Sequence, residues 1–221
     1  MPPKKAAERA ISDGTVKSAT GKSLKQWYAI LDKFGADKKG HTAGAAYLHN
    51  SHDLSGWWSQ MVTVRYEQDR GLRAVGQRMN GRYEVSIQRT IAAAQKQAYA
   101  AFTDPKLLSK WFTTKARIDL RPGGRYSNSD GDQGEYRTVT PPRRVRFTWE
   151  NEKHCPGSLV EATFTPSGKG KVAVRIQHTK LPDAKGRDDM RMGWSWTLDS
   201  LKSFLETGRP IQFEEWKKTW K

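Results

Sequence analysis

The chain has 221 residues, a formal net charge of +16 and 36% hydrophobic residues, and nine of its residues are Trp. This length suits one domain or two small ones, and the aromatic content argues against a wholly disordered chain. No stretch reaches the roughly 20 apolar residues of a membrane span, and the first ten residues hold no apolar signal core. The single cysteine, Cys155, excludes an intramolecular disulfide framework and a multi-cysteine zinc site. These features favour an intracellular, cytoplasmic globular protein.

The first segment with a clear helical pattern follows a lead-in. Residues 1–19 are rich in Lys, Ala, Ser and Thr, and we expect them to be flexible or weakly helical. Apolar side chains then recur at three- and four-residue spacing over residues 24–34, which predicts a helix. Ser23 is placed to cap its start and Gly35 to end it.

Two further helices are predicted before the first linker. A short one is expected over residues 41–49, and a longer one with a broad apolar face runs from 53 to about 73. Gly76 and the pair Asn80–Gly81 then mark a turn or linker. Residues 20–76 are therefore predicted to form a small helical domain of unknown function.

The pattern changes from helix to strand after Gly81. Apolar and polar residues alternate over residues 83–88, which predicts a half-buried strand. Residues 92–102 are helical in composition. A short second helix is then expected to start with Asp104 as its N-cap and Pro105 at its first position.

The following stretch reads as strands separated by turns, and a long helix comes after it. The predicted strands are 125–128, 135–140, 144–149, 160–164 and 172–178. A helical stripe over 187–206 follows and ends at a Gly-Arg-Pro break. The tail, residues 207–221, contains Phe213, Trp216 and Trp220 and is too aromatic for a merely solvated segment.

The order of elements predicts an α+β fold for residues 81–206. Short connections favour an antiparallel meander, and such a sheet has one buried face that the long C-terminal helix is placed to cover. A strongly curved sheet wrapped on one helix leaves a cavity between the two.

Several short motifs in this region carry a family resemblance. They are Ala101–Pro105, Leu108, Trp111–Phe112, Leu120–Tyr126, Gly134–Tyr136, Pro141–Val145, Thr148–Trp149, His178, Leu181–Asp183, Gly193–Trp194 and Leu198–Leu201. In this order and spacing, residues 81–206 resemble the SRPBCC (START-like, helix-grip) superfamily, and within it the family named after the activator of the heat-shock-protein ATPase homologue. One departure is Ala93, where family members often have Pro. Residues 20–75 resemble an uncharacterised helical domain found fused to such modules.

The resemblance implies a helix-grip cavity that accepts an apolar or aromatic ligand. The candidates for its lining are inward-facing residues of the strands and helices: Trp111, Phe112, Tyr126, Tyr136, Phe147, Trp149, His178, Trp194 and Leu198. For each aromatic residue taken singly, simple core packing is the favoured explanation. His178 continues the inward face of its strand, so it could orient a ligand or could bond structurally to the loop at Leu181–Pro182.

Other candidate chemistries have simpler explanations. His49 and His52 could share a helical face as metal ligands, but Asn50 and Ser51 are expected to break the helix between them, and no metal is predicted. Cys155 is interpreted as an incidental cysteine in a turn. The chain lacks a phosphate-binding glycine loop, a nucleophile elbow and a convincing acid–base pair, so no cofactor and no catalytic residue are predicted.

Three binding functions remain as hypotheses. The leading one is a non-catalytic module that holds a hydrophobic or aromatic small molecule. The second, by analogy with the family, is a chaperone-associated protein interaction through the basic surface and the Trp-rich tail. The third is non-specific nucleic-acid binding, which is less favoured because the charge is spread, with 13 Lys/Arg and 7 Asp/Glu before residue 81 and 26 and 16 after it. The tail could instead be an intramolecular strap against the N-terminal helices.

Overall fold

The computed structural model describes residues 11–78 and 80–220 and divides the chain into two compact units between Val75 and Gly76. Each unit has a hydrophobic core of its own. None of the helices in the described ranges is long and apolar enough to cross a membrane.

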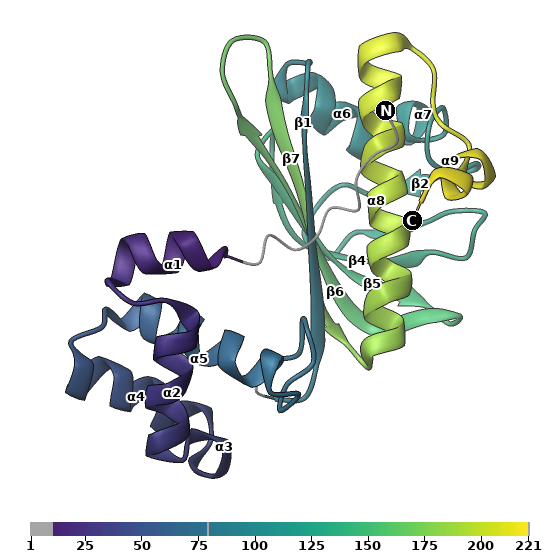
Figure 1. The fold of residues 1–221 in the computed structure, drawn as a ribbon. Helices are drawn as coiled ribbons and strands as arrows, with labels where there is room; N and C mark the ends of the chain where they lie inside the picture. Colours follow the sequence, from purple (N-terminus) through teal and green to yellow (C-terminus); the bar gives the residue numbers. More distant parts are fainter. Residues whose placement is uncertain (1–10, 79, 221) are drawn as a thin grey trace. The chain divides into compact units, whose positions relative to one another are not determined.

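The first unit is entirely helical (Figure 1). Its elements are α1 (Asp13–Thr20), α2 (Leu24–Phe34), α3 (Ala36–Lys39), α4 (His41–His52) and α5 (Gly56–Asp69). Its core is built by side chains spaced along α1, α2, α4 and α5, among them Val16, Trp27, Leu31, Leu48, Val62 and Tyr66. The apolar residues that recur at helical spacing in the sequence therefore lie on the buried faces of these helices.

Local capping explains where these helices begin and end. Ser23 and Gln26 form a reciprocal capping box at the start of α2, and Gly35 ends the helix with a left-handed φ of 75°. Ser55 caps α5, which therefore starts at Gly56 rather than at the expected residue 53. The expected break at Asn50 is wrong, because α4 continues without interruption to His52.

Residues 11–20 are more ordered than the expected lead-in. They contain α1, which Ser12 caps by accepting a hydrogen bond from the Thr15 backbone and which Gly21 ends in a left-handed conformation. Val16 of this helix is 3% exposed and belongs to the core. The expectation for residues 1–10 lies outside the described residues.

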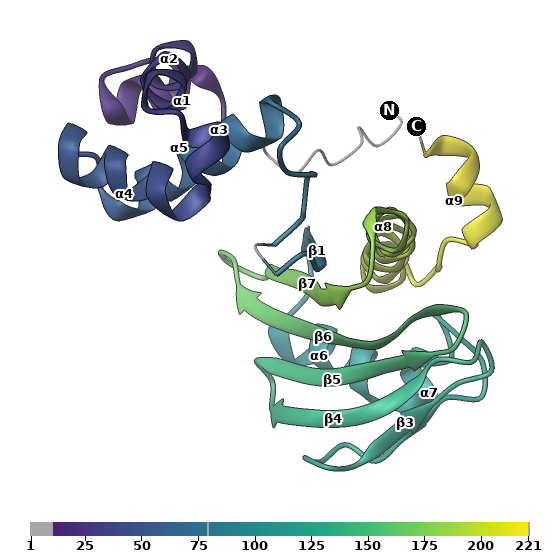
Figure 2. The same cartoon turned by 90° about the horizontal axis from the view of Figure 1, so that it is seen from below.

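The second unit contains one curved sheet, two short helices before its middle strands, and a long helix (Figure 2). The elements are β1 (Tyr83–Ile91), α6 (Gln95–Thr103), α7 (Pro105–Leu108), β2 (Arg117–Ile118), β3 (Arg125–Ser127), β4 (Gln133–Thr140), β5 (Arg144–Asn151), β6 (His154–Pro166), β7 (Val172–Leu181), α8 (Ala184–Thr207) and α9 (Phe213–Thr219). The strands follow the order β1-β7-β6-β5-β4-β3-β2, and every pair is antiparallel.

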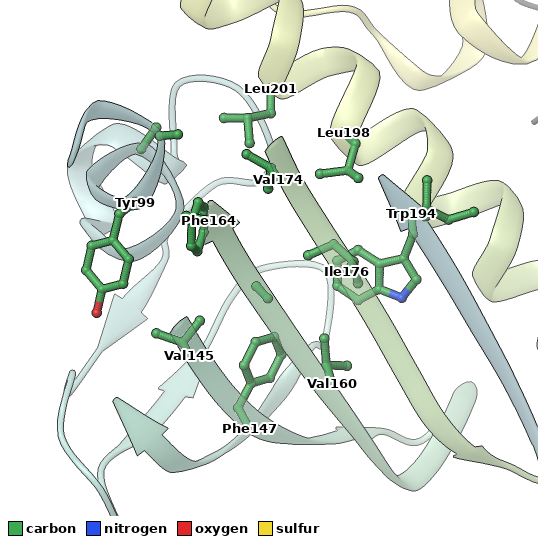
Figure 3. Packing of buried hydrophobic residues seen from close by; sticks show 14 of the residues in the cluster. Tyr99, Val145, Phe147, Val160, Phe164, Val174, Ile176, Trp194, Leu198 and Leu201 are labelled. Atoms are coloured by element: carbon green, nitrogen blue, oxygen red, sulfur yellow. The ribbon is translucent and has the colours of Figure 1, made fainter. Parts of the chain in front are cut away.

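Alternation along the strands places the core on the face of the sheet that α8 covers. Phe147 and Val160 are paired across β5 and β6, and both are almost wholly buried. From the helix, Trp194, Leu198 and Leu201 point toward these strands (Figure 3). The predicted helix-grip architecture, with a curved antiparallel sheet wrapped on a long C-terminal helix, is therefore confirmed.

The strand β6 is longer than the sequence pattern indicated. It begins at His154 instead of residue 160, so Cys155 lies in a strand, and the turn falls at Glu152–Lys153. Cys155 has a φ of 53° and Gly157 a φ of 75°, an irregular backbone that interrupts the alternation used to recognise strands. The Cys155 side chain is buried in this strand, so its expected position in a turn is wrong.

The helix α8 begins where it contacts Cys155. Asp183 caps it by accepting a hydrogen bond from the Gly186 amide at 2.6 Å. A Cβ atom at position 186 would lie only 2.7 Å from Cys155 Sγ, so a glycine lets the first turn of the helix approach the strand. At Gly193, in the middle of the same helix, a Cβ atom would meet no atom within 4 Å.

This difference predicts opposite effects of the same substitution at two positions. Gly186→Ala should lower the free energy of unfolding by about 1–3 kcal/mol because the methyl group overpacks against Cys155. Gly193→Ala should raise it by up to about 1 kcal/mol through helix propensity. Denaturant titrations measure both, and in a Cys155→Ala background the loss caused by Gly186→Ala should shrink markedly. An undiminished loss in that background would show that the sulfur is not the obstacle.

Candidate functional site

A small apolar pocket lies among the loop after α7, the strands β2 to β5 and the inner face of α8. Its volume is about 40 Å³. The lining residues are Phe102, Leu108, Phe112, Ala116, Ile118, Tyr126, Ser127, Asn128, Asp132, Tyr136, Phe147, Trp149, Trp194 and Thr197. The pocket therefore occupies the space between sheet and helix in which a cavity was expected.

Six of the nine predicted lining residues line this pocket. They are Phe112, Tyr126, Tyr136, Phe147, Trp149 and Trp194. The other three are placed elsewhere in the core. The Trp111 indole donates to the Ala101 carbonyl at 2.9 Å, whereas Leu198 and His178 are both fully buried.

The aromatic side chains form a continuous wall. Tyr126, Tyr136 and Phe147 make a triangle with ring centroids 5.1–5.8 Å apart and inclined planes. Trp149 lies edge-on to Trp194 at 5.3 Å, which joins the sheet to α8. Inclined rings at these separations are the favoured geometry for aromatic pairs, so the wall is held by its own ring contacts.

The hydroxyl groups in the wall are uncharged at neutral pH. Burial raises the pKa of both Tyr126 and Tyr136 above the ordinary phenol value. The Tyr126 hydroxyl donates to the Thr148 carbonyl at 2.9 Å. Among the described residues, the Tyr99 hydroxyl is buried without a hydrogen-bond partner, whereas the Tyr136 hydroxyl also makes no hydrogen bond but is not fully buried. Tyr136 thus brings an unused donor and acceptor to the pocket.

Asp132 is the one carboxylate in the lining, and it is 7% exposed. Two amide groups hold it: Asn151 Nδ2 donates at 2.7 Å and Asn128 Nδ2 at 3.0 Å. Asn128 Oδ1 in turn accepts from the backbone amides of Asp130 and Asp132. The turn before β4 therefore fixes the position of this carboxylate at one end of the pocket.

His178 connects the sheet to α8 through a directed chain of hydrogen bonds. The Trp194 indole donates to His178 Nδ1 at 2.9 Å, so Nε2 carries the ring proton and donates to Ser158 Oγ at 2.7 Å. The Ser158 hydroxyl in turn donates a hydrogen bond to the Cys155 carbonyl. Both ring nitrogens are occupied, and neither of them bonds to the loop at Leu181–Pro182. Burial lowers the pKa of His178 from 6.5 to about 3, so the ring is neutral.

The prediction from sequence missed several lining residues. Phe102 and Leu108 come from α6 and α7, Ile118 from the two-residue strand β2, and Asp132 from the turn before β4. Leu108 belongs to the apolar face expected for its helix, which was a usable signal. Ile118 and Asp132 carried none, because a strand of two residues has no periodicity and a turn aspartate is common on protein surfaces.

The histidines of the first unit are engaged in structural contacts. His41 Nδ1 lies 3.1 Å from the Glu67 carboxylate, which Arg73 also contacts at 2.8 Å. His49 Nδ1 donates to the Leu54 carbonyl at 2.7 Å. Within residues 11–78 and 80–220, no three His, Cys, Asp or Glu side chains gather as a possible metal site.

The comparison with protein families finds one match to the second unit. The model of the family described as "Activator of Hsp90 ATPase homolog 1-like protein" matches residues 92–206, slightly more than half of the chain. A protein of Schizosaccharomyces pombe, "Uncharacterized protein C1711.08", is 28% identical over 83 residues. That alignment covers 37% of this chain and 25% of the yeast protein, so the chain matches about a quarter of that relative's length.

Solved structures share the fold of the second unit. The crystal structure of CalU16 from Micromonospora echinospora is 24% identical with a TM-score of 0.52, covering 63% of this chain and 86% of that one. The solution structure of the Aha1 dimer from Colwellia psychrerythraea is 20% identical with a TM-score of 0.51, covering 57% and 97%. At these identities the similarity shows the fold alone.

The neutral His178 predicts a pH dependence of stability. The unfolded chain takes up a proton on this residue near pH 6.5, whereas the folded domain does so only near pH 3. Its contribution is therefore complete above pH 6.5 and is lost as the pH falls toward 3, by about 1.4 kcal/mol per pH unit. Denaturant titrations between pH 7 and 5, above the carboxylate range, should show this slope in the parent chain and a flatter one in His178→Gln. Equal slopes would contradict the assignment.

Proposed function

The chain belongs to the family of Activator of Hsp90 ATPase homolog 1-like proteins, and we propose that its helix-grip domain binds a small apolar or aromatic molecule in the pocket described above. The observation that carries this proposal is the convergence of seven aromatic side chains on one apolar space. Small-molecule sites are typically lined in this way, with a few polar groups that set the orientation of the ligand.

The polar groups in the wall determine which hydrogen-bonding groups the ligand would carry. Tyr136 lines the pocket and its hydroxyl makes no hydrogen bond to a described residue. A ligand hydroxyl or amine could satisfy it, and Asp132 could accept a second hydrogen bond from the same molecule. Apolar burial would supply most of the affinity, at about 25 cal/mol per Å².

The volume of the pocket requires the wall to move when a ligand enters. A volume of about 40 Å³ has room for one or two water molecules, whereas drug-sized ligands occupy roughly 300–1,000 Å³. Phe102, Leu108, Phe112 and Ile118 are only partly buried, and all four lie on the helices, loop and short strand at the edge of the pocket. These four side chains can move outward without opening the sheet, so entry is expected on this side.

A second candidate function is the binding of a chaperone ATPase, which the family membership favours. A groove of about 300 Å³ on β3, β4 and β5 offers a polar surface for such a contact. Arg137 in this groove is paired with Glu135 at 2.7 Å, whereas Arg125 makes no ion pair with any described residue. The groove also contains Glu135 and Glu150, so a partner surface of mixed charge, with an acidic group opposite Arg125, would complement it.

The small-molecule proposal predicts that filling the pocket weakens binding. Indole, titrated while ligand-observed NMR is recorded, should bind the parent chain. Ala116→Leu should weaken that binding at least about tenfold, because the larger side chain occupies the pocket. Ala173→Leu adds the same atoms to a residue of β7 outside the pocket and should leave binding unchanged. The proposal fails if indole does not bind, or if Ala116→Leu binds it as tightly as the parent.

The chaperone proposal makes a separate prediction. The purified chain should change the ATPase rate of a chaperone of the Hsp90 type, and the double variant Arg125→Glu/Arg137→Glu should abolish that change by charge reversal. A double variant with an intact thermal transition provides the control for folding. An unaltered ATPase rate at saturating concentrations of the parent chain would rule out this function.

A further inference from the structure

The C-terminal segment 209–220 runs back along α8 and forms the short helix α9 (Figures 1 and 2). The family match ends at residue 206, so this segment lies outside the matched region. Trp216 of α9 is 4% exposed, which shows that the segment is a packed part of the domain. We refer to residues 209–220 as the C-terminal strap.

Four side chains of α8 hold the strap, and one of them, Ser203, donates its hydroxyl to the Arg209 carbonyl at 2.7 Å. The Trp196 indole donates to the Ile211 carbonyl at 2.8 Å. Ser200 Oγ accepts from the Ile211 amide at 3.2 Å and donates to the Trp111 carbonyl at 3.0 Å. Asp199 of α8 accepts a hydrogen bond from the strap, because the Trp216 indole donates to it at 2.9 Å. Through Ser200, one hydroxyl thus joins the strap to the loop that contains Phe112.

A chain of ring contacts runs from the strap to the pocket. Phe213 of the strap lies edge-on to Trp196 at 5.4 Å, and Trp196 lies 5.7 Å from Phe112. Phe112 lines the pocket. The other two rings of this series, Trp196 and Phe213, are only partly buried. Trp196 is therefore confined between the strap on one side and the wall of the pocket on the other.

Most residues of the strap other than Trp216 are exposed or only partly buried. A groove of about 470 Å³ remains between α8 and α9, lined by Lys202, Ser203, Ile211, Trp216 and other residues of both helices. Within α9, Trp216 is the single buried residue among the seven of the helix. A short helix with few buried contacts opens at a lower free energy than the core of its domain.

We propose that the C-terminal strap sets the size of the ligand pocket by holding Trp196 against Phe112. With the strap in place, Phe112 stays in the wall and the pocket is small. When the strap is released, Trp196 and Phe112 can move outward, and the pocket accepts a bulkier apolar molecule. This inference rests on the proposed small-molecule function and adds the element that regulates it.

The test compares two probes, indole as the small one and N-phenyl-1-naphthylamine as the bulky one. A chain that ends at Gly208, and separately Phe213→Ala, should bind the bulky probe at least about tenfold more tightly than the full chain. Phe112→Ala should have the same effect with the strap intact, because it removes the wall residue directly. Hydrogen exchange at residues 109–116 should become faster when the strap is removed and should be unchanged by Glu214→Ala, an exposed position of α9.

The controls separate this proposal from a purely stabilising role and from failure of the pocket itself. Gly186→Ala lowers stability without contacting the strap, so it should leave the preference between the probes unchanged. If Phe112→Ala binds neither probe, the proposed function fails. If Phe112→Ala binds the bulky probe but the shortened chain and Phe213→Ala do not, the pocket stands and the regulation by the strap is overturned. An equal gain in affinity for the bulky probe in the Gly186→Ala variant would also overturn the regulation by the strap.

Discussion

The apolar stripe of α8 and the concave face of the sheet must bury each other, and most of the second unit follows from this pairing. Strands β1, β7, β6 and β5 present alternate side chains to the helix, and the buried residues of α8 recur along its inner face. At the far side, toward β4 and β3, the sheet curves away from the helix and the aromatic wall fills the widening space. The pocket is the part of that space that the side chains leave open.

His178 shows how the packing of α8 against the sheet is fixed in one position. Its two ring nitrogens join Trp194 on the helix to Ser158 on the neighbouring strand, inside a region from which water is excluded. A buried polar chain of this kind stabilises only when every member is satisfied, and here each hydrogen bond has a defined donor and acceptor. The position of α8 along the sheet is thereby tied to one particular strand register.

The periodicity of apolar residues was sufficient to predict the regular helices and strands, because burial on one face imposes a period of two on strands and of about 3.6 on helices. It was insufficient wherever the backbone departs from regular geometry, as at Cys155 in β6, or where an element is very short, as in β2. For the site, alternation placed Tyr126, Tyr136 and Phe147 on the correct face. It could not supply the volume of the pocket, the partners of His178 or the contact of Phe213 with Trp196, because these depend on tertiary packing between segments distant in sequence.

The abundant tryptophans differ from ordinary apolar core residues because each indole carries an N–H group that needs an acceptor when it is buried. Six indole N–H groups donate to acceptors inside their own unit: those of Trp27, Trp111, Trp149, Trp194, Trp196 and Trp216. Exchange for phenylalanine would preserve much of the bulk at such a position but leave an acceptor without its donor. Ordinary cores tolerate the exchange of one large apolar residue for another during evolution. At these six positions such exchanges are therefore expected to be restricted.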